Sequence, residues 1–169
     1  TAHYIIYKEF MADPEAMLRT LMLYEKACRG GEMSACVELG AMYRDGRGVD
    51  RDRARAMELF ERACEADDPT GCTNVGYLLE KGLGVEADPK KASQKYLQGC
   101  RGGHPEGCTY LGSMYARGDG VAEEMNRAAE LFEKGCDGGD QEGCDLLEKT
   151  CEEGVDAACE RTDESGGDS

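Results

Sequence analysis

Residues 60–85 read FERACEADDPTGCTNVGYLLEKGLGV, and this stretch decides the fold because close copies of it recur along the sequence. One copy covers residues 24–49, another covers residues 96–121, and the first half recurs from residue 132. Each copy carries two cysteines eight positions apart, and the first cysteines of successive copies are 36 residues apart. A fixed period of about 20 to 50 residues is typical of supersecondary units that stack into an array. The sequence therefore predicts a repeat protein with the blocks 18–53, 54–89, 90–125 and 126–161.

Within each block, the apolar residues follow the spacing of two amphipathic helices. In the second block, the first helix has apolar residues at i, i+3, i+4, i+7 and i+8, namely Ala56, Leu59, Phe60, Ala63 and Cys64. A second apolar stripe opens at Cys72 and ends at the turn Gly82–Val85, which is typical of a left-handed helix stop. Two helices cannot bury both apolar faces alone. Each block therefore predicts a helical hairpin that stacks on its neighbours in an all-α, right-handed α/α solenoid.

These residues carry a resemblance to a known family. An aromatic residue followed by Glu-Lys-Ala-Cys, a glycine-rich turn, a second cysteine, Leu-Gly-x-x-Tyr and Gly-x-Gly-Val resembles the Sel-one-like repeat, a relative of the tetratricopeptide repeat. The added cysteine pairs are similar to those of the cysteine-rich branch, best known as the Helicobacter cysteine-rich proteins. The match covers roughly residues 18–161. It implies a solenoid in which each hairpin has its own disulfide.

The positions of the cysteines support this pairing. A cysteine in the last turn of one predicted helix faces a cysteine in the first turn of the next helix across the hairpin loop. Zinc sites favour pairs two to four residues apart, and thiol oxidoreductases favour C-x-x-C; the sequence has neither spacing. We therefore expect an oxidising compartment and the five bridges Cys28–Cys36, Cys64–Cys72, Cys100–Cys108, Cys136–Cys144 and Cys151–Cys159.

The two ends of the sequence depart from the repeat. Residues 148–159 match residues 25–36, so one helix is expected to end the fourth block and also to begin a shortened fifth unit at about 148–161. Glu148 replaces the glycine that elsewhere lets helices approach closely, which suits the open end of an array. Asp13 is expected to cap the first helix. Residues 1–17 predict an N-terminal cap segment, and residues 162–169 predict a disordered acidic tail.

The charge balance bears on partners. The protein has 20 basic and 35 acidic residues, a net charge of −15, whereas nucleic-acid binding normally needs a basic face. We therefore expect no nucleic-acid partner, and no window is apolar enough to predict a membrane span. The second block has three basic and eight acidic residues, and the fourth has four and eleven. Such charge either keeps helices solvated or attracts a basic or extended polypeptide.

Residues for catalysis are sparse. The only histidines are His3 and His104, and His104 shares its repeat position with Asp68 and Asp140, which predicts a helix cap rather than a base. The sequence has no Ser-x-x-Lys string for an acylating serine, and two isolated histidines cannot build a zinc site. We expect no catalytic residue, metal or cofactor. The resemblance to the cysteine-rich branch implies one alternative, a protein that binds or weakly hydrolyses β-lactams.

Tetratricopeptide-like stacking predicts where a partner would bind. If the first helices of the blocks line the concave groove, their solvent-facing residues mix both charges with amides, which suits a peptide backbone. The candidates are Arg55, Glu58, Arg62, Lys91, Gln94, Gln98, Arg127, Glu130 and Lys134. The apolar stretch Tyr4–Tyr7 could dock in the groove of a second molecule and give a weak homodimer.

The sequence thus predicts a non-catalytic protein–protein interaction scaffold that binds an extended polypeptide in its concave groove. The expected location is secreted or periplasmic. Besides the β-lactam alternative, a related mitochondrial group suggests an assembly or thiol-handling factor of the intermembrane space.

Overall fold

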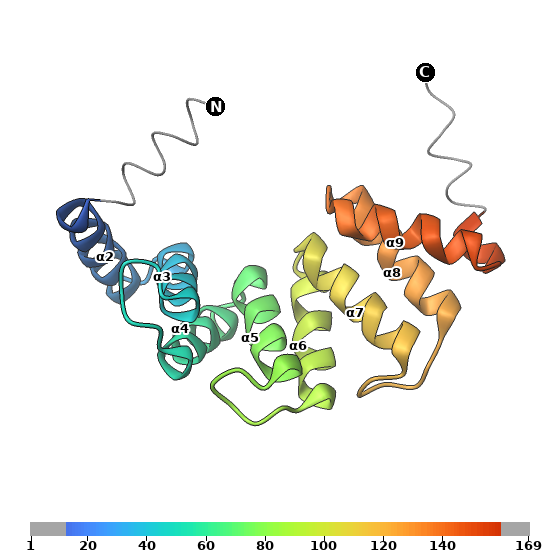
Figure 1. The fold of residues 1–169 in the computed structure, drawn as a ribbon, viewed down its shortest axis with the longest axis horizontal. Coiled ribbons are helices and arrows are strands. Elements are labelled where there is room, and N and C mark those ends of the chain that lie inside the picture. Colours follow the sequence, from blue (N-terminus) through green and yellow to red (C-terminus); the bar gives the residue numbers. More distant parts are fainter. Residues whose placement is uncertain (1–12, 160–169) are drawn as a thin grey trace, which may run out of the picture.

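The protein is a curved array of helical hairpins (Figure 1). A computed structural model describes residues 13–159, and in this range the protein forms helices and turns without strands. The elements are α2 (Pro14–Arg29), α3 (Met33–Asp45), α4 (Arg53–Glu65), α5 (Pro69–Lys81), α6 (Pro89–Arg101), α7 (Pro105–Arg117), α8 (Met125–Asp137) and α9 (Gln141–Glu152). The predicted helical solenoid is confirmed. Residues 1–12 of the predicted cap segment and the predicted acidic tail lie outside the described residues.

The helix ends follow from local sequence. Four helices begin after an aspartate whose carboxylate accepts a hydrogen bond from a backbone N–H two or three residues on, and these are Asp13, Asp52, Asp68 and Asp88. Three helices end at a glycine with φ between 63° and 70°, namely Gly46, Gly82 and Gly118. Only glycine adopts this left-handed backbone without strain, so the predicted helix stops are confirmed.

Across each Gly-x-Gly-Val turn, an aromatic ring of one helix lies on a glycine of the helix before it. The contacts join Gly40 with Phe60, Gly76 with Tyr96 and Gly112 with Phe132. A Cβ atom at any of these glycines would lie only 2.7–2.8 Å from a ring carbon. The rings are buried, and the glycines therefore set how closely the two helices approach.

All five predicted disulfides are present, and each lies within its own pair of cysteines. The paired Cα atoms are 4.4–4.7 Å apart, so the bridges hold the ends of consecutive helices together at the loop. Every cysteine of the protein is bridged. The sulfur atoms also belong to the core, since Cys36, Cys64 and Cys72 are almost fully buried.

Two rows of helices form the array, and they pack differently. Helix α5 packs directly on α7, and α7 packs on α9, in addition to the contacts of each with its neighbours in sequence. Within residues 13–159, α4, α6 and α8 make no comparable contact with one another. Elements on the inside of a curve lie closer together than those outside, so α5, α7 and α9 form the inner row. The first helices of the blocks, expected to line the concave face, stand in the outer row, and that they bind a partner stays a prediction.

Helix α9 takes part in two hairpins. Its first turn carries Cys144, bridged to Cys136 of α8, and its last turn carries Cys151, bridged to Cys159. Residues 156–159 form a helical turn, and Ala158 packs in a buried cluster at this end of the array. Glu148 is exposed.

The glycine contact gives a first prediction. Gly76→Ala should lower the free energy of unfolding by about 1–3 kcal/mol because the new methyl group meets the Tyr96 ring. Alanine is intrinsically the better helix former by about 1 kcal/mol, so a net loss identifies the close contact as its cause. Urea unfolding measures the change. Glu148→Ala alters the equivalent exposed position and should shift stability by less than about 0.5 kcal/mol; equal losses in both variants would contradict the account.

The bridges give a second prediction. Replacing Cys64 and Cys72 together by alanine should lower the free energy of unfolding by about 2.5 kcal/mol, because the bridge closes a loop of about nine residues in the unfolded polypeptide. Denaturant titration of both proteins measures the difference. The same double replacement of Cys151 and Cys159 opens an equal loop and serves as the comparison. A loss below about 1 kcal/mol at Cys64–Cys72 would show that the bridge adds little.

Candidate functional site

One face of α5 carries side chains that take no part in the contacts between aromatic rings and glycines. Thr70, Thr73, Asn74 and Tyr77 follow the spacing i, i+3, i+4 and i+7, so they share that face. They line a groove of about 600 Å³, which we call the polar groove. Its remaining lining comes from the α3–α4 region, from Leu83 and from the start of α7, and comprises Arg44, Asp45, Arg51, Arg53, Leu83, His104, Glu106 and Tyr110.

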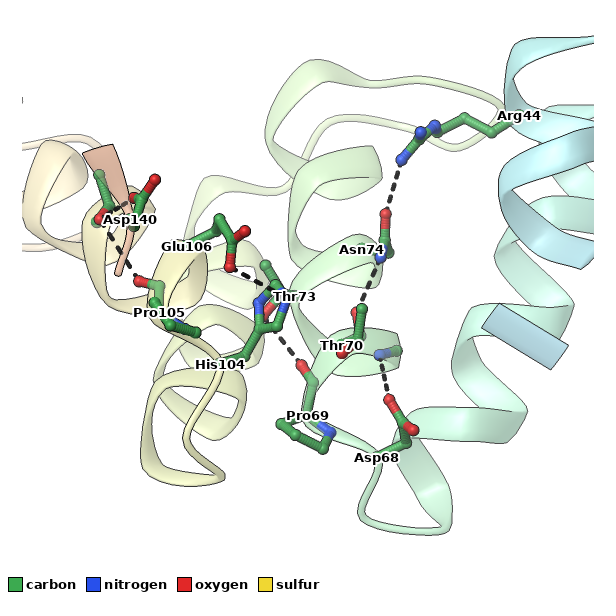
Figure 2. A network of polar contacts seen from close by, with 12 residues as sticks. Arg44, Asp68, Pro69, Thr70, Thr73, Asn74, His104, Pro105, Glu106 and Asp140 are labelled. Atoms are coloured by element: carbon green, nitrogen blue, oxygen red, sulfur yellow. Dashed lines mark hydrogen bonds and ion pairs between the residues drawn. The ribbon is translucent and has the colours of Figure 1, made fainter. Parts of the chain in front are cut away.

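A series of hydrogen bonds joins α3 to α5 along the groove (Figure 2). Arg44 donates to both carboxylate oxygens of Asp45, at 2.7 and 2.9 Å, and its Nη1 donates to Oδ1 of Asn74 at 2.7 Å. Asn74 in turn donates from Nδ2 to the carbonyl oxygen of Thr70 at 2.9 Å. The hydrogen bond from Arg44 holds the pKa of Asp45 below its usual range. Arg44 and Asn74 are thus held in place before any partner binds.

A second link joins α5 to α7 and recurs one repeat on. Thr73 donates its hydroxyl proton to the carbonyl oxygen of Pro69, so it accepts from Nδ1 of His104 at 3.0 Å. In the equivalent pair, Thr109 donates to the carboxylate of Asp140, which Figure 2 labels beside Pro105. His104 directly precedes α7, and its side chain makes no capping hydrogen bond to the backbone of that helix. The predicted position of His104 as a cap residue is confirmed, and its ring joins neighbouring repeats.

Tyrosines provide the apolar part of the groove. The rings of Tyr77 and Tyr110 lie 6.3 Å apart, and Tyr110 also packs on Tyr96 at 5.3 Å. Burial, together with the carboxylates of Glu142, Asp140 and Glu106, raises the pKa of Tyr110. Its phenol therefore stays protonated and available as a donor at neutral pH.

The nine candidates predicted from the sequence lie elsewhere. They stand on α4, α6 and α8, the outer row, and none lines the polar groove. Some are engaged within the protein, since Arg55 pairs with Glu25 at 3.6 Å and lies over the Tyr43 ring. Gln94 and Gln98 line a smaller recess of about 350 Å³ beside the α4–α5 loop. That these residues bind a partner stays a prediction.

The sequence reasoning missed the groove residues. The stripe on α5 has helical spacing and combines threonine, asparagine and tyrosine, so it could have been found by the same test that found the core stripes. Arg51 and Arg53 gave no such signal because they lie at the end of a loop and in the first turn of α4.

The apolar surface of α2 is a further exposed feature. Leu18, Met22 and Leu23 are 55–67% exposed on this first helix of the array. The predicted homodimer rests on Tyr4–Tyr7, which lie outside the described residues, and it stays a prediction.

A buried carboxylate ties the inner and outer rows together. The Glu80 side chain is 8% exposed and accepts hydrogen bonds from Tyr96 at 2.7 Å, from Lys81 at 2.9 Å and from Arg117 at 2.9 Å. Burial alone would raise the pKa of Glu80, but the hydrogen bonds from Lys81 and Tyr96, and the positive charges of Lys81 and Arg117, together hold it below its usual value. Burial and Glu80 raise the pKa of Tyr96.

The described helices carry neither a metal-ligand cluster nor a membrane-spanning segment. Between residues 13 and 159, no three His, Cys, Asp or Glu side chains gather so that they could hold a metal ion. None of the helices in that range is long and apolar enough to cross a membrane.

Hairpins locked by disulfides, aromatic rings seated on glycines and a groove along the inner row together define a helical-repeat scaffold. The Sel1 repeat family model matches residues 17–32, 34–68, 69–104 and 105–140, and the protein therefore belongs to this family. The matched repeats begin with α3, α5 and α7, half a repeat out of phase with the blocks drawn from the cysteines. Sel1 repeats generally serve as protein–protein interaction scaffolds.

Solved structures share the fold. A Sel1 repeat protein from Oxalobacter formigenes is 27% identical with a TM-score of 0.68, and the match covers 86% of this protein and 67% of that one. Helicobacter pylori cysteine-rich protein B is 28% identical with a TM-score of 0.63, over 79% of this protein and 96% of that one. A protective antigen of uropathogenic Escherichia coli that displays this repeat fold is 24% identical with a TM-score of 0.69, over 86% and 35%. The comparison with curated proteins gave no match.

The Glu80 cluster gives a third prediction. Glu80→Gln should lower the free energy of unfolding by about 1–3 kcal/mol at pH 7, because Tyr96 and Arg117 lose a charged acceptor. A carboxyl whose pKa is depressed by folding stabilises above its unfolded pKa and loses that effect as the pH falls through its folded pKa. The difference between the two proteins should therefore be constant above about pH 5 and shrink below about pH 4.5. Denaturant titrations across this range measure it.

Glu86→Gln is the matched control for this measurement. Glu86 is exposed, so its replacement should change stability by less than about 0.5 kcal/mol at any of these pH values. A difference between wild type and Glu80→Gln that grows as the pH falls would contradict the assignment.

Proposed function

We propose that this protein is a non-catalytic scaffold that binds an extended segment of another polypeptide in the polar groove. The observation that carries the proposal is that one continuous groove draws its lining from three successive repeats, on α3, α5 and α7 and in the first turn of α4. A surface that crosses successive repeats suits a ligand that extends along the same direction.

The chemistry of the groove suits a peptide. A peptide backbone presents donors and acceptors in alternation, and the groove offers the Asn74 amide, hydroxyl groups and guanidinium groups within one volume. The Tyr77 hydroxyl makes no hydrogen bond to any described residue, so it is available to a partner. Tyrosine rings add contact area at little cost in side-chain entropy, and they are enriched at the energetic centres of protein interfaces.

The outer row is the competing surface. Its nine candidate residues mix charges with amides, and Glu58 and Glu130 are the acidic members through which a basic segment would bind. The two surfaces face different sides of the array, so variants separate them.

We also propose that the protein works in an oxidising compartment outside the cytoplasm, secreted or periplasmic. The five disulfides fit such a compartment, since free thiols are kept reduced in the cytosol. No feature of the described residues favours the β-lactam or the intermembrane-space alternative, and both stay predictions.

Selection from a synthetic library of random ten-residue peptides tests the groove. Immobilised wild-type protein should enrich a defined set of sequences. Tyr77→Ala and Asn74→Ala should each weaken binding of the most enriched peptide about tenfold, as loss of a central interface side chain typically does. Fluorescence anisotropy measures the affinities, and thermal melting confirms that the variants are folded.

Glu58→Ala combined with Glu130→Ala is the control on the outer row and should bind as wild type does. If wild type enriches no sequence, the proposal fails. If the outer pair weakens binding while the groove variants do not, the outer row is the binding surface.

A further inference from the structure

The charged groups that line the polar groove are unevenly neutralised. Three arginines face two carboxylates there. Arg44 holds both oxygens of Asp45, and the Glu106 carboxylate lies 3.2 Å from Nε2 of His104. Asp45 is therefore already paired, and neither carboxylate of the lining makes an ion pair with the other two arginines.

Arg51 and Arg53 are those two arginines. Neither side chain has an ion pair or hydrogen bond to any residue between 13 and 159. In addition, Nε of Arg53 is buried and has no hydrogen-bond partner in the described structure. A guanidinium has five N–H donors and no acceptor, so only an acceptor can satisfy it, and a buried donor without one costs free energy. A ligand oxygen placed in the groove would supply what the protein itself does not.

The surroundings make these two cations unusual. The protein has 35 acidic residues against 20 basic ones, so unpaired positive charge in a groove is a local exception. An acidic ligand is attracted to these two arginines and repelled by the rest of the surface. This contrast favours one binding register, because every other docking position is penalised.

We infer that the polar groove selects polypeptide segments that bear carboxylates, with Arg51 and Arg53 as the residues that bind them. The inference rests on the proposed function, that the groove binds polypeptide, and it names the partner's chemistry. Arginine suits this role because its planar fork meets both oxygens of a carboxylate, as Arg44 meets those of Asp45 within the same groove.

The rest of the lining determines which kind of residue fits beside the carboxylate in the bound segment. Tyr77, Tyr110 and Leu83 supply ring faces and an aliphatic side chain, and they share the groove with the two arginines. An acidic residue next to an apolar residue therefore fits better than a run of acidic residues alone. The carboxylate can belong to an aspartate or glutamate side chain or to the C-terminus of a polypeptide, and these sources need separate probes.

Two synthetic libraries of random ten-residue peptides distinguish the sources, one ending in a free carboxylate and the other in a carboxamide. Wild-type protein should enrich peptides rich in Asp or Glu from both libraries if side chains bind, and only from the free-carboxylate library if the C-terminus binds. Either result supports the inference. Enriched peptides without acidic residues, drawn equally from both libraries, would overturn it.

The arginines are tested with the most enriched peptide. Arg51→Gln combined with Arg53→Gln should weaken binding at least about tenfold, because charge-assisted hydrogen bonds are lost. Arg55→Gln combined with Arg62→Gln removes the same charge from the outer face of α4 and should change affinity less than about twofold. Equal effects of the two pairs would show that only net charge matters and would overturn the inference.

One further variant keeps the test decisive if the double replacement does not fold. Arg53→Lys retains the charge but loses the fork, and it should weaken binding measurably while the melting curve stays as in wild type. Unchanged affinity in folded variants of both arginines would overturn the inference and leave the proposed function intact, provided that Tyr77→Ala still weakens binding. If wild type enriches no peptide, both fail together.

Discussion

The structure depends on the contact between an aromatic ring and a glycine on consecutive helices. Phe60 lies on Gly40, and the same contact recurs 36 residues on in each following repeat. Because the glycine has no side chain, the ring reaches the backbone of the neighbouring helix and both helices bury their apolar faces. The spacing of the whole array follows from this distance. Every other contact either holds the hairpins in this position or uses the surface that they leave open.

The disulfides and the polar groove lie in different parts of each repeat, and this separation matters. The bridges close the loops that follow α2, α4, α6 and α8 and the loop after α9, whereas the groove lies along the exposed faces of α3, α5 and α7. The core and the bridges supply the stability. The Asn74 side chain lies outside that core, and its exchange therefore alters binding more readily than folding, whereas the ring of Tyr77 also packs against the core.

The fold could be predicted from the sequence because its signals repeat. Four signals recur at one period: the apolar stripes of the helices, the capping aspartates, the left-handed glycine stops and the cysteine pairs. Each copy of the repeat therefore supports the interpretation of the other copies. The groove could not be predicted in the same way. The curvature of the array determines which row of helices lies inside. That curvature follows from small differences in packing distance, which no single position of the repeat encodes. Arg53 enters the groove only because the turn through Gly46 and Gly48, both at positive φ, brings the backbone back toward α5.

Helix α9 ends one hairpin and starts another, and this sharing limits how the array can grow. A duplicated 36-residue unit inserted between α4 and α8 would find a glycine before it and an aromatic ring after it, so gene duplication can lengthen the protein from within. In α9 the glycine position holds Glu148, and a copied unit placed after α9 would meet a carboxylate where its ring must sit. A repeat can therefore be added between α4 and α8 more readily than after α9.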